Sequence, residues 1–314
     1  MLTNLLIAIR CIGPLLICLL VGVLVRRSGI LSDEVIRQLN RFVFTFLFPQ
    51  HLFLTVYNAD FSETFSLPMI LFQVGIVSLY CFGSVILLSR MKLEKRLIAM
   101  LNQNAYRSNL NIISLPLSEA LLGPSGLASM GIISAVLTPL YNLYAVIVLE
   151  SHTDGRKKSK GELVLEIIKN PMIIGAAAGF AAHLLPFKLP GTVTSAISSM
   201  GKAGTTLALI LLGASLRIGS LRKNRKQLII GNLWRLIAAP LLGLLLALAL
   251  GFAGSELAII VLALGAPTAS VSFTMCQVYD CEPELAAEMV ATTSMLCCLS
   301  LFLWIFLLKQ LGIV

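Results

Sequence analysis

Charged residues are scarce in this sequence. They make up 12% of its 314 residues, whereas soluble domains carry about 25%. Hydrophobic residues make up 57%, and many of them stand in apolar runs of about 20 residues, the length that spans a bilayer. A soluble globule of this size is therefore excluded, and we expect an all-α transmembrane protein that lies in the lipid bilayer.

Residues that carry enzyme chemistry are also few. The three histidines form no constellation with a nucleophile, and the seven cysteines show no metal or redox spacing. No glycine-rich loop of the kind that cradles phosphate is present, which argues against direct driving by ATP. We therefore expect no enzyme activity and no cofactor or metal. The net charge of +9 does not indicate a nucleic-acid partner, because the basic residues lie in short clusters between apolar runs.

The apolar pattern predicts ten membrane spans, five in each half of the chain. The first five spans are expected at 6–25, 36–57, 67–89, 96–121 and 127–149. The second five are expected at 164–185, 193–216, 227–251, 256–279 and 284–308. The polar stretch from Ser151 to Glu162 between the two sets is either a linker between halves or simply a cytoplasmic loop. The predicted division is a first repeat at 1–150, a cytoplasmic linker at 151–163 and a second repeat at 164–314.

Lysine and arginine predict the orientation of these spans. They cluster after the first, third, fifth and seventh spans, whereas the other short loops carry almost none. Basic loops face the cytoplasm, so both termini are expected outside the cell membrane. The fourth span is rich in asparagine, but it must cross, because otherwise the later basic loops would face the opposite side.

Five spans in each half imply that the halves insert in opposite senses, which is typical of secondary transporters. A faint internal repeat supports this interpretation. Pro14 and Gly22 are eight residues apart in the first span, and Pro171 and Gly179 are eight apart in the sixth. We therefore predict two inverted five-helix repeats.

Pro116 and Pro267 lie in the fourth and ninth spans, which are corresponding elements of the two halves. Proline removes a backbone donor and clashes with the preceding turn, so we expect each proline to interrupt its helix. The freed backbone groups must then line a cavity or meet protein partners, and the new half-helix would present amides that suit an anion. The alternative is an ordinary proline kink packed by neighbouring helices.

Five segments along nearly the whole chain form a recognisable set: Ser108–Leu117, Asn170–Gly175, Leu207–Leu216, Ala266–Ser272 and Pro283–Ala287. In this order they resemble the motifs of the auxin efflux carrier family of membrane transporters. The resemblance implies ten helices as two inverted repeats, with helices four and nine broken and crossing at mid-membrane. It implies a scaffold of helices 1, 2, 6 and 7, commonly paired in a homodimer, and a transport domain of helices 3–5 and 8–10. It also implies elevator-like export or exchange of small organic anions such as mono- or dicarboxylates.

This sequence departs from the family pattern near both breaks. Asn111 and Ser114 stand where the family usually has small residues, and Val271 stands where it often has asparagine. A substrate is therefore not carried over from a relative. A sodium- or proton-coupled carrier of another solute on a related fold is the alternative, and it would need more carboxylates at the crossing than Glu119 alone.

The expected substrate-binding residues surround the two prolines. They are Asn109, Asn111, Ser114, Pro116, Pro267, Thr268, Ser270 and Ser272. The asparagine amides would hold a carboxylate or a cation, or would instead hydrogen-bond a neighbouring helix. The hydroxyl groups have the same choice between a substrate and a bond to their own helix backbone.

Two charged residues of the fourth span allow two interpretations each. Glu119 is a candidate for coupling transport to a proton or cation, because intramembrane carboxylates are costly and usually functional; the alternative is a first-turn carboxylate that satisfies the helix dipole. Arg107 lies about 13 Å before Pro116 at helical rise. We expect its side chain to extend to the membrane surface, and the alternative is a guide for entering anions.

Overall fold

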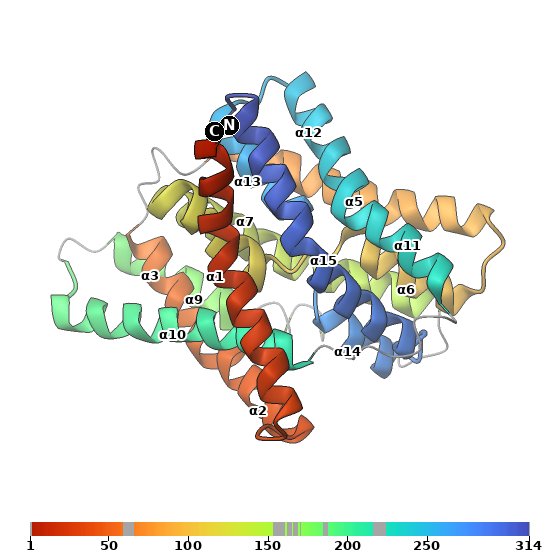
Figure 1. The fold of residues 1–314 in the computed structure, drawn as a ribbon, viewed down its shortest axis with the longest axis horizontal. Helices are drawn as coiled ribbons and strands as arrows, with labels where there is room; N and C mark the ends of the chain where they lie inside the picture. The colour runs from red at the N-terminus through yellow and green to blue at the C-terminus, as the bar shows by residue number, and fades with distance from the viewer. Residues whose placement is uncertain are drawn as a thin grey trace.

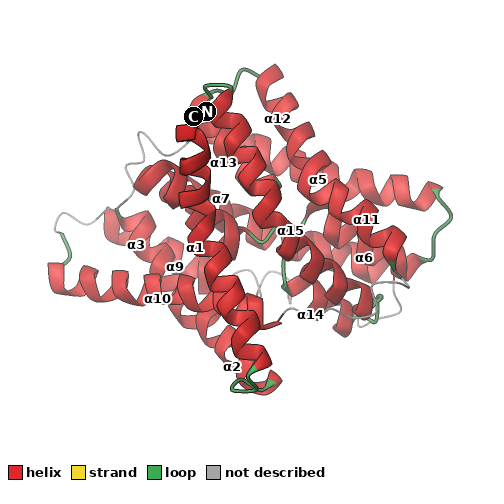
Figure 2. Cartoon of the chain, viewed as in Figure 1, coloured by secondary structure: helices red, strands yellow, loops and turns green. Residues whose placement is uncertain are grey.

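The computed structural model describes residues 2–58, 66–152, 161, 165, 169, 171–184, 188–215 and 224–313. The regular elements in this part of the chain are helices (Figure 2). Among the described residues, five helices are long and apolar enough to cross a membrane: Leu67–Arg90, Leu110–His152, Gly191–Ser215, Arg225–Ala249 and Pro283–Gln310. The chain is therefore helical and multi-pass, as its composition predicts.

The helices of the first half follow the predicted spans closely. They are α1 (Leu2–Arg27), α2 (Asp33–Phe42), η1 (Val43–Leu47), α3 (Phe48–Tyr57), α5 (Leu67–Arg90), α6 (Lys95–Tyr106), η2 (Leu110–Ser114) and α7 (Leu115–His152). The backbone of Gly123 is not helical, with φ of 70° and ψ of −154°. A positive φ is readily adopted only by glycine, so Gly123 divides α7 into two segments at the junction expected between the fourth and fifth spans.

The second half begins after the predicted linker, most of which lies outside the described residues. Its helices are α9 (Pro171–His183), α10 (Gly191–Ser215), α11 (Arg225–Leu233), η3 (Trp234–Ala238), α12 (Ala239–Ala249), α13 (Gly254–Leu264), α14 (Val271–Val278) and α15 (Pro283–Gln310). The ninth predicted span is thus two helices, α13 and α14, with residues 265–270 between them.

One group of helices packs through glycine. Helix α1 lies against α10, and α9 lies against α3 (Figure 1). Gly22 of α1 directly faces the α10 backbone, and Gly179 of α9 directly faces the α3 backbone at Phe53. Small residues let transmembrane helices approach to backbone contact. The two glycines of the sequence repeat therefore make equivalent contacts in the two halves.

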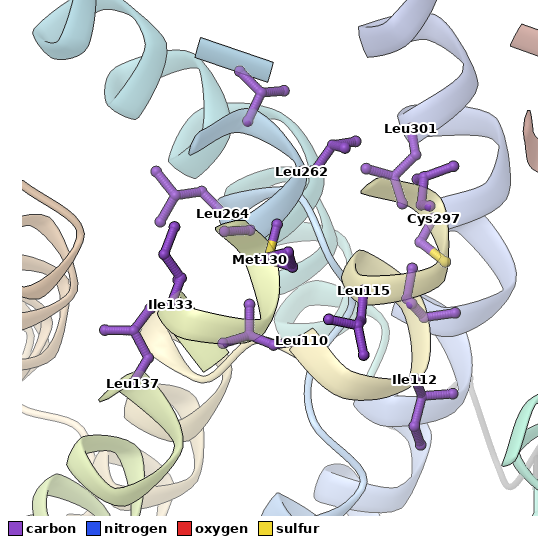
Figure 3. Close-up of a cluster of buried hydrophobic side chains, with 14 of the residues drawn as sticks. Leu110, Ile112, Leu115, Met130, Ile133, Leu137, Leu262, Leu264, Cys297 and Leu301 are labelled. Atoms are coloured by element: carbon purple, nitrogen blue, oxygen red, sulfur yellow. The ribbon is translucent and has the colours of Figure 1, made fainter. Parts of the chain in front are cut away.

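A second group of helices surrounds the ends of α6 and α13. Helix α5 packs on α6, α12 on α13, and α15 on α11 and α14. Figure 3 shows part of the apolar core that this packing creates, with Leu110, Ile112 and Leu115 from the η2–α7 segment near Leu262 of α13 and Leu301 of α15. This core holds the irregular segments 107–109 and 265–270 in place.

Each of the three π-helical turns, η1, η2 and η3, is followed by a proline. Pro49, Pro116 and Pro240 each lie two residues after the last residue of the turn. In each case the residue just before the proline donates its N–H to the carbonyl five residues earlier, as Leu115 does to Leu110. A widened turn of this kind removes the clash between a proline ring and the carbonyl four residues before it.

The prediction that Pro116 interrupts the fourth span is therefore wrong in its position. The helix stays continuous through Pro116 because η2 absorbs the proline. The interruption lies at residues 107–109, between the end of α6 at Tyr106 and the start of η2 at Leu110. Pro267, in contrast, does lie in the gap between α13 and α14.

Candidate functional site

The two interrupted segments, residues 107–109 and 265–270, hydrogen-bond to each other, and we call them the paired breaks. The N–H of Asn109 donates to the Pro267 carbonyl at 2.8 Å, and the N–H of Ala269 donates to the Arg107 carbonyl at 3.1 Å. Ser108 and Thr268 therefore lie opposite each other in an antiparallel bridge. This pairing satisfies backbone groups that could not face lipid.

A cavity of about 260 Å³ adjoins the paired breaks. Arg107, Asn109 and Ser270 from the breaks line it, together with Asn111 of η2 and Asn142 of α7. Its opposite wall includes Thr45 of η1 and Pro171 at the start of α9. The cavity thus lies between the glycine-packed group of helices and the group that carries the paired breaks.

Two asparagine oxygens at this cavity accept hydrogen bonds from within the protein, whereas other polar groups there have no partner among the described residues. The Asn111 Oδ1 accepts from the Ser134 hydroxyl at 2.6 Å, and the Asn142 Oδ1 accepts from the Arg107 guanidinium. The Asn109 Nδ2 and the Ser270 hydroxyl are buried and have no hydrogen-bond partner among the described residues. Because buried polar groups are normally paired, these donors mark a place for a ligand that accepts hydrogen bonds.

Arg107 does not extend to the membrane surface, so that expectation is wrong. Its side chain is only 3% exposed, and it donates to the Gln103 Oε1 at 3.1 Å as well as to Asn142. The physical reason is the position of the break, which places Arg107 at the cavity rather than one helix length away. Within the described ranges, no carboxylate forms an ion pair with it. Its positive charge is therefore available to an anion.

Other predicted site residues support the breaks or lie elsewhere. The Ser114 hydroxyl donates to the Leu262 carbonyl at 2.9 Å, and the Thr268 hydroxyl donates to the Asn104 Oδ1 at 2.5 Å. Pro116, Pro267 and Ser272 do not line the cavity, and neither does Glu119, whose side chain is exposed on the first segment of α7. Of the predicted set, Arg107, Asn109, Asn111 and Ser270 are thus brought together.

Sequence reasoning missed one residue of this region, Arg235 in η3. Its side chain is fully buried beside the paired breaks, and it donates to the Leu264 carbonyl just before the second break and to the Ala266 carbonyl within it. The sequence does contain a signal for Arg235, because an arginine inside the predicted span 227–251 is energetically costly in a membrane. Such a residue is usually functional. Apart from Arg107, only the basic residues of the loops carry a prediction, as markers of orientation.

Comparison with known proteins supplies the class of this site. Residues 7–305 match the family model described as membrane transport protein. The chain belongs to this family. It is the auxin efflux carrier family that the sequence motifs resemble, so that prediction is confirmed. The family and its relatives are transporters and not enzymes, and the cavity is therefore a site in a membrane transporter.

Several relatives of this transporter match over most of their length. An uncharacterized transporter of Methanocaldococcus jannaschii, MJ1031, is 25% identical in an alignment that covers 93% of this chain and 96% of the relative. One from Methanothermobacter thermautotrophicus is 24% identical over 92% of this chain and 94% of its own. The transporter YfdV of Escherichia coli is 21% identical over 82% and 83%.

Proposed function

We propose that this transporter is a secondary carrier that exports or exchanges a small organic anion, such as a mono- or dicarboxylate, bound in the cavity beside the paired breaks. The observation that carries the proposal is the donor-rich lining: one buried guanidinium with the unpartnered Asn109 amide and Ser270 hydroxyl. Charge-assisted hydrogen bonds from arginine to carboxylate are among the strong ones. A carboxylate would therefore satisfy the groups that the protein leaves unpaired.

A cation-binding version of the same architecture has less support. A sodium or proton site requires oxygen acceptors or a carboxylate, and no described residue that lines the cavity is acidic. Two of the three asparagine oxygens at the cavity, those of Asn111 and Asn142, already accept hydrogen bonds from Ser134 and Arg107. The cavity is thus better suited to negative charge than to positive charge.

The proposed architecture is ten membrane spans in two inverted repeats, with the fourth and ninth spans crossing at mid-membrane. Its support is the equivalent contacts of Gly22 and Gly179 and the direct pairing of the two breaks. In this arrangement both termini lie outside the cell membrane, as the basic loops predict.

The proposed movement is elevator-like. Helices α1, α2–α3, α9 and α10 would form the scaffold and its homodimer contact, and α5–α7 with α11–α15 would carry the substrate. Support comes from the cavity walls, because Thr45 and Pro171 belong to the first group and Arg107 and Ser270 to the second. Sliding of one group against the other would expose the cavity to alternate sides.

The first test removes the unpartnered donors. In Asn109→Ala and Ser270→Ala we expect carboxylate affinity to fall about 10-fold in each variant, because each loses one hydrogen bond to a charged group. Thermal-shift titration with a panel of mono- and dicarboxylates measures the affinity, and proteoliposome uptake measures transport. Ser125→Ala is the control, because its exposed hydroxyl bonds only the Leu122 carbonyl. A wild-type protein that responds to none of these anions would disprove the proposal.

A coupling role for Glu119 stays a prediction and has its own experiment. If this carboxylate carries the coupling proton, Glu119→Gln should abolish the stimulation of uptake by a pH gradient while leaving exchange of substrate without a gradient intact. Glu150→Gln, a change at the far end of α7, is the control. Unchanged uptake and unchanged pH dependence in Glu119→Gln would remove the coupling role.

A further inference from the structure

Arg235 is a buried charge that has no part in the transport mechanism proposed above. It lies in η3 with no exposed surface. Its Nε donates to the Ala266 carbonyl at 2.7 Å, and its Nη2 donates to the Leu264 carbonyl at 2.9 Å and to the Ser108 hydroxyl. Its Nη1 donates to the Ala105 carbonyl at 3.4 Å. One guanidinium therefore contacts both of the paired breaks and the end of the helix that precedes each of them.

These contacts fall on helix ends of one polarity. Ala105 lies in the last turn of α6, and Leu264 is the last residue of α13. The carbonyls at a helix C-terminus carry a partial negative charge, and the amides at an N-terminus carry a partial positive one. The helices that follow the breaks, starting at Leu110 and Val271, present their amide ends beside the cavity. Arg235 thus compensates the negative ends alone.

No carboxylate offsets this charge within the part of the chain that the structure describes. A buried cation without a counter-ion is costly unless its hydrogen bonds are complete. Here all three guanidinium nitrogens donate to acceptors. With the two negative helix ends compensated, the positive potential of the two amide ends is unopposed in a low-dielectric region next to the cavity, where it acts over a longer range than in water.

We infer that Arg235 is a positioning residue: it holds the paired breaks in register and sets a positive potential in the cavity, without contacting the substrate. The second part of this inference rests on the proposed anion transport. The first part does not, because the register of the breaks is a property of the empty protein. Arg235 is absent from the cavity lining, so its effect on substrate passes through the backbone and the field.

Lysine and glutamine separate the two roles of Arg235. Lysine keeps the positive charge, but its single ammonium cannot reproduce the planar fork that reaches Ala105, Leu264 and Ala266 together. Glutamine loses the charge as well. If both roles are real, Arg235→Lys impairs the register and keeps much of the anion affinity, whereas Arg235→Gln impairs both.

The experiment combines hydrogen exchange with anion binding on the full-length protein in detergent. Peptides that contain the amides of Asn109 and Ala269 report the register, since these two N–H groups form the bonds between the breaks. The control is Trp304→Phe, which removes a buried hydrogen bond to the Leu236 carbonyl in the same π turn but touches neither break. Binding is measured by thermal-shift titration with malonate and acetate.

We expect faster exchange at both peptides in Arg235→Lys and Arg235→Gln, and wild-type exchange there in Trp304→Phe. Anion affinity should fall about 10- to 100-fold in Arg235→Gln, the range for a lost interaction of a charged group, and by less in Arg235→Lys. Unchanged exchange in both arginine variants overturns the role in register. Equal anion affinity in wild type and Arg235→Gln overturns the proposed effect of Arg235 on the electrostatic potential of the cavity. If wild type binds no anion, the proposed function fails while the exchange result still decides the register.

Discussion

Replacing Arg107 with glutamine should abolish anion transport, with initial uptake reduced more than about 100-fold. Two lost charge-assisted bonds to one carboxylate, at about 1.5–3 kcal/mol each, account for an effect of this size. Arg107 is the cation in the described lining of the cavity, so no neighbour can take over its role. Initial rates of carboxylate uptake into proteoliposomes, at matched protein incorporation, give the measurement.

Arg96→Gln is the matched control for this change. Arg96 lies in the first turn of the same helix, α6, and its guanidinium forms an exposed ion pair with Asp280 at 2.7 Å. Exposed pairs contribute about 0–1 kcal/mol, so uptake should stay near the wild-type rate. Arg107→Lys should keep part of the activity, because it retains the charge and loses the two-pronged geometry. Wild-type uptake in Arg107→Gln would show that the substrate does not enter this cavity.

Replacing Gly22 with alanine should destabilise the protein by about 2 kcal/mol or more, the upper part of the range for overpacking. A Cβ at this position would meet backbone atoms of Ile210, Gly213 and Ala214 in α10, which cannot rotate away as a side chain can. Helices α1 and α10 would therefore have to separate. Thermal unfolding in detergent, followed by size-exclusion chromatography, should show a lower melting temperature and a smaller monodisperse fraction.

The control for the glycine prediction is Gly83→Ala in α5. A Cβ there meets nothing within 4 Å, and alanine is a better helix former than glycine by about 1 kcal/mol. The melting temperature should therefore stay the same or rise slightly. If Gly22→Ala melts like Gly83→Ala, the close contact between α1 and α10 does not contribute to stability.

The sequence predicts the helical elements well because a chain in lipid must form its backbone hydrogen bonds internally, which restricts the possible structures of an apolar run. An apolar run of about 20 residues has few alternatives to a helix when no water can satisfy its backbone. The helices α5 and α15 begin and end within about two residues of the expected spans. Even the division of α7 at Gly123 falls in the interval between the expected fourth and fifth spans, 96–121 and 127–149.

The site was predicted less completely, and the reason lies in tertiary context. A local rule says that proline interrupts a helix, yet η2 accommodates Pro116 and the break lies before Leu110. The local sequence does not show which turn will widen, because neighbouring helices decide it. The same shift moved Arg107 from an expected surface position into the cavity. Asn109, Asn111 and Ser270 line one cavity because they flank the breaks wherever these begin, and their role in binding substrate stays a prediction.

The bonds between the two breaks join main-chain atoms: the Asn109 amide to the Pro267 carbonyl and the Ala269 amide to the Arg107 carbonyl. Such bonds do not depend on which side chains stand at these positions, provided that the amide donors are kept. Substitution can therefore change the side chains that line the cavity while the backbone bonds between the breaks persist. The chemistry of the lining is in this way separable from the frame that presents it.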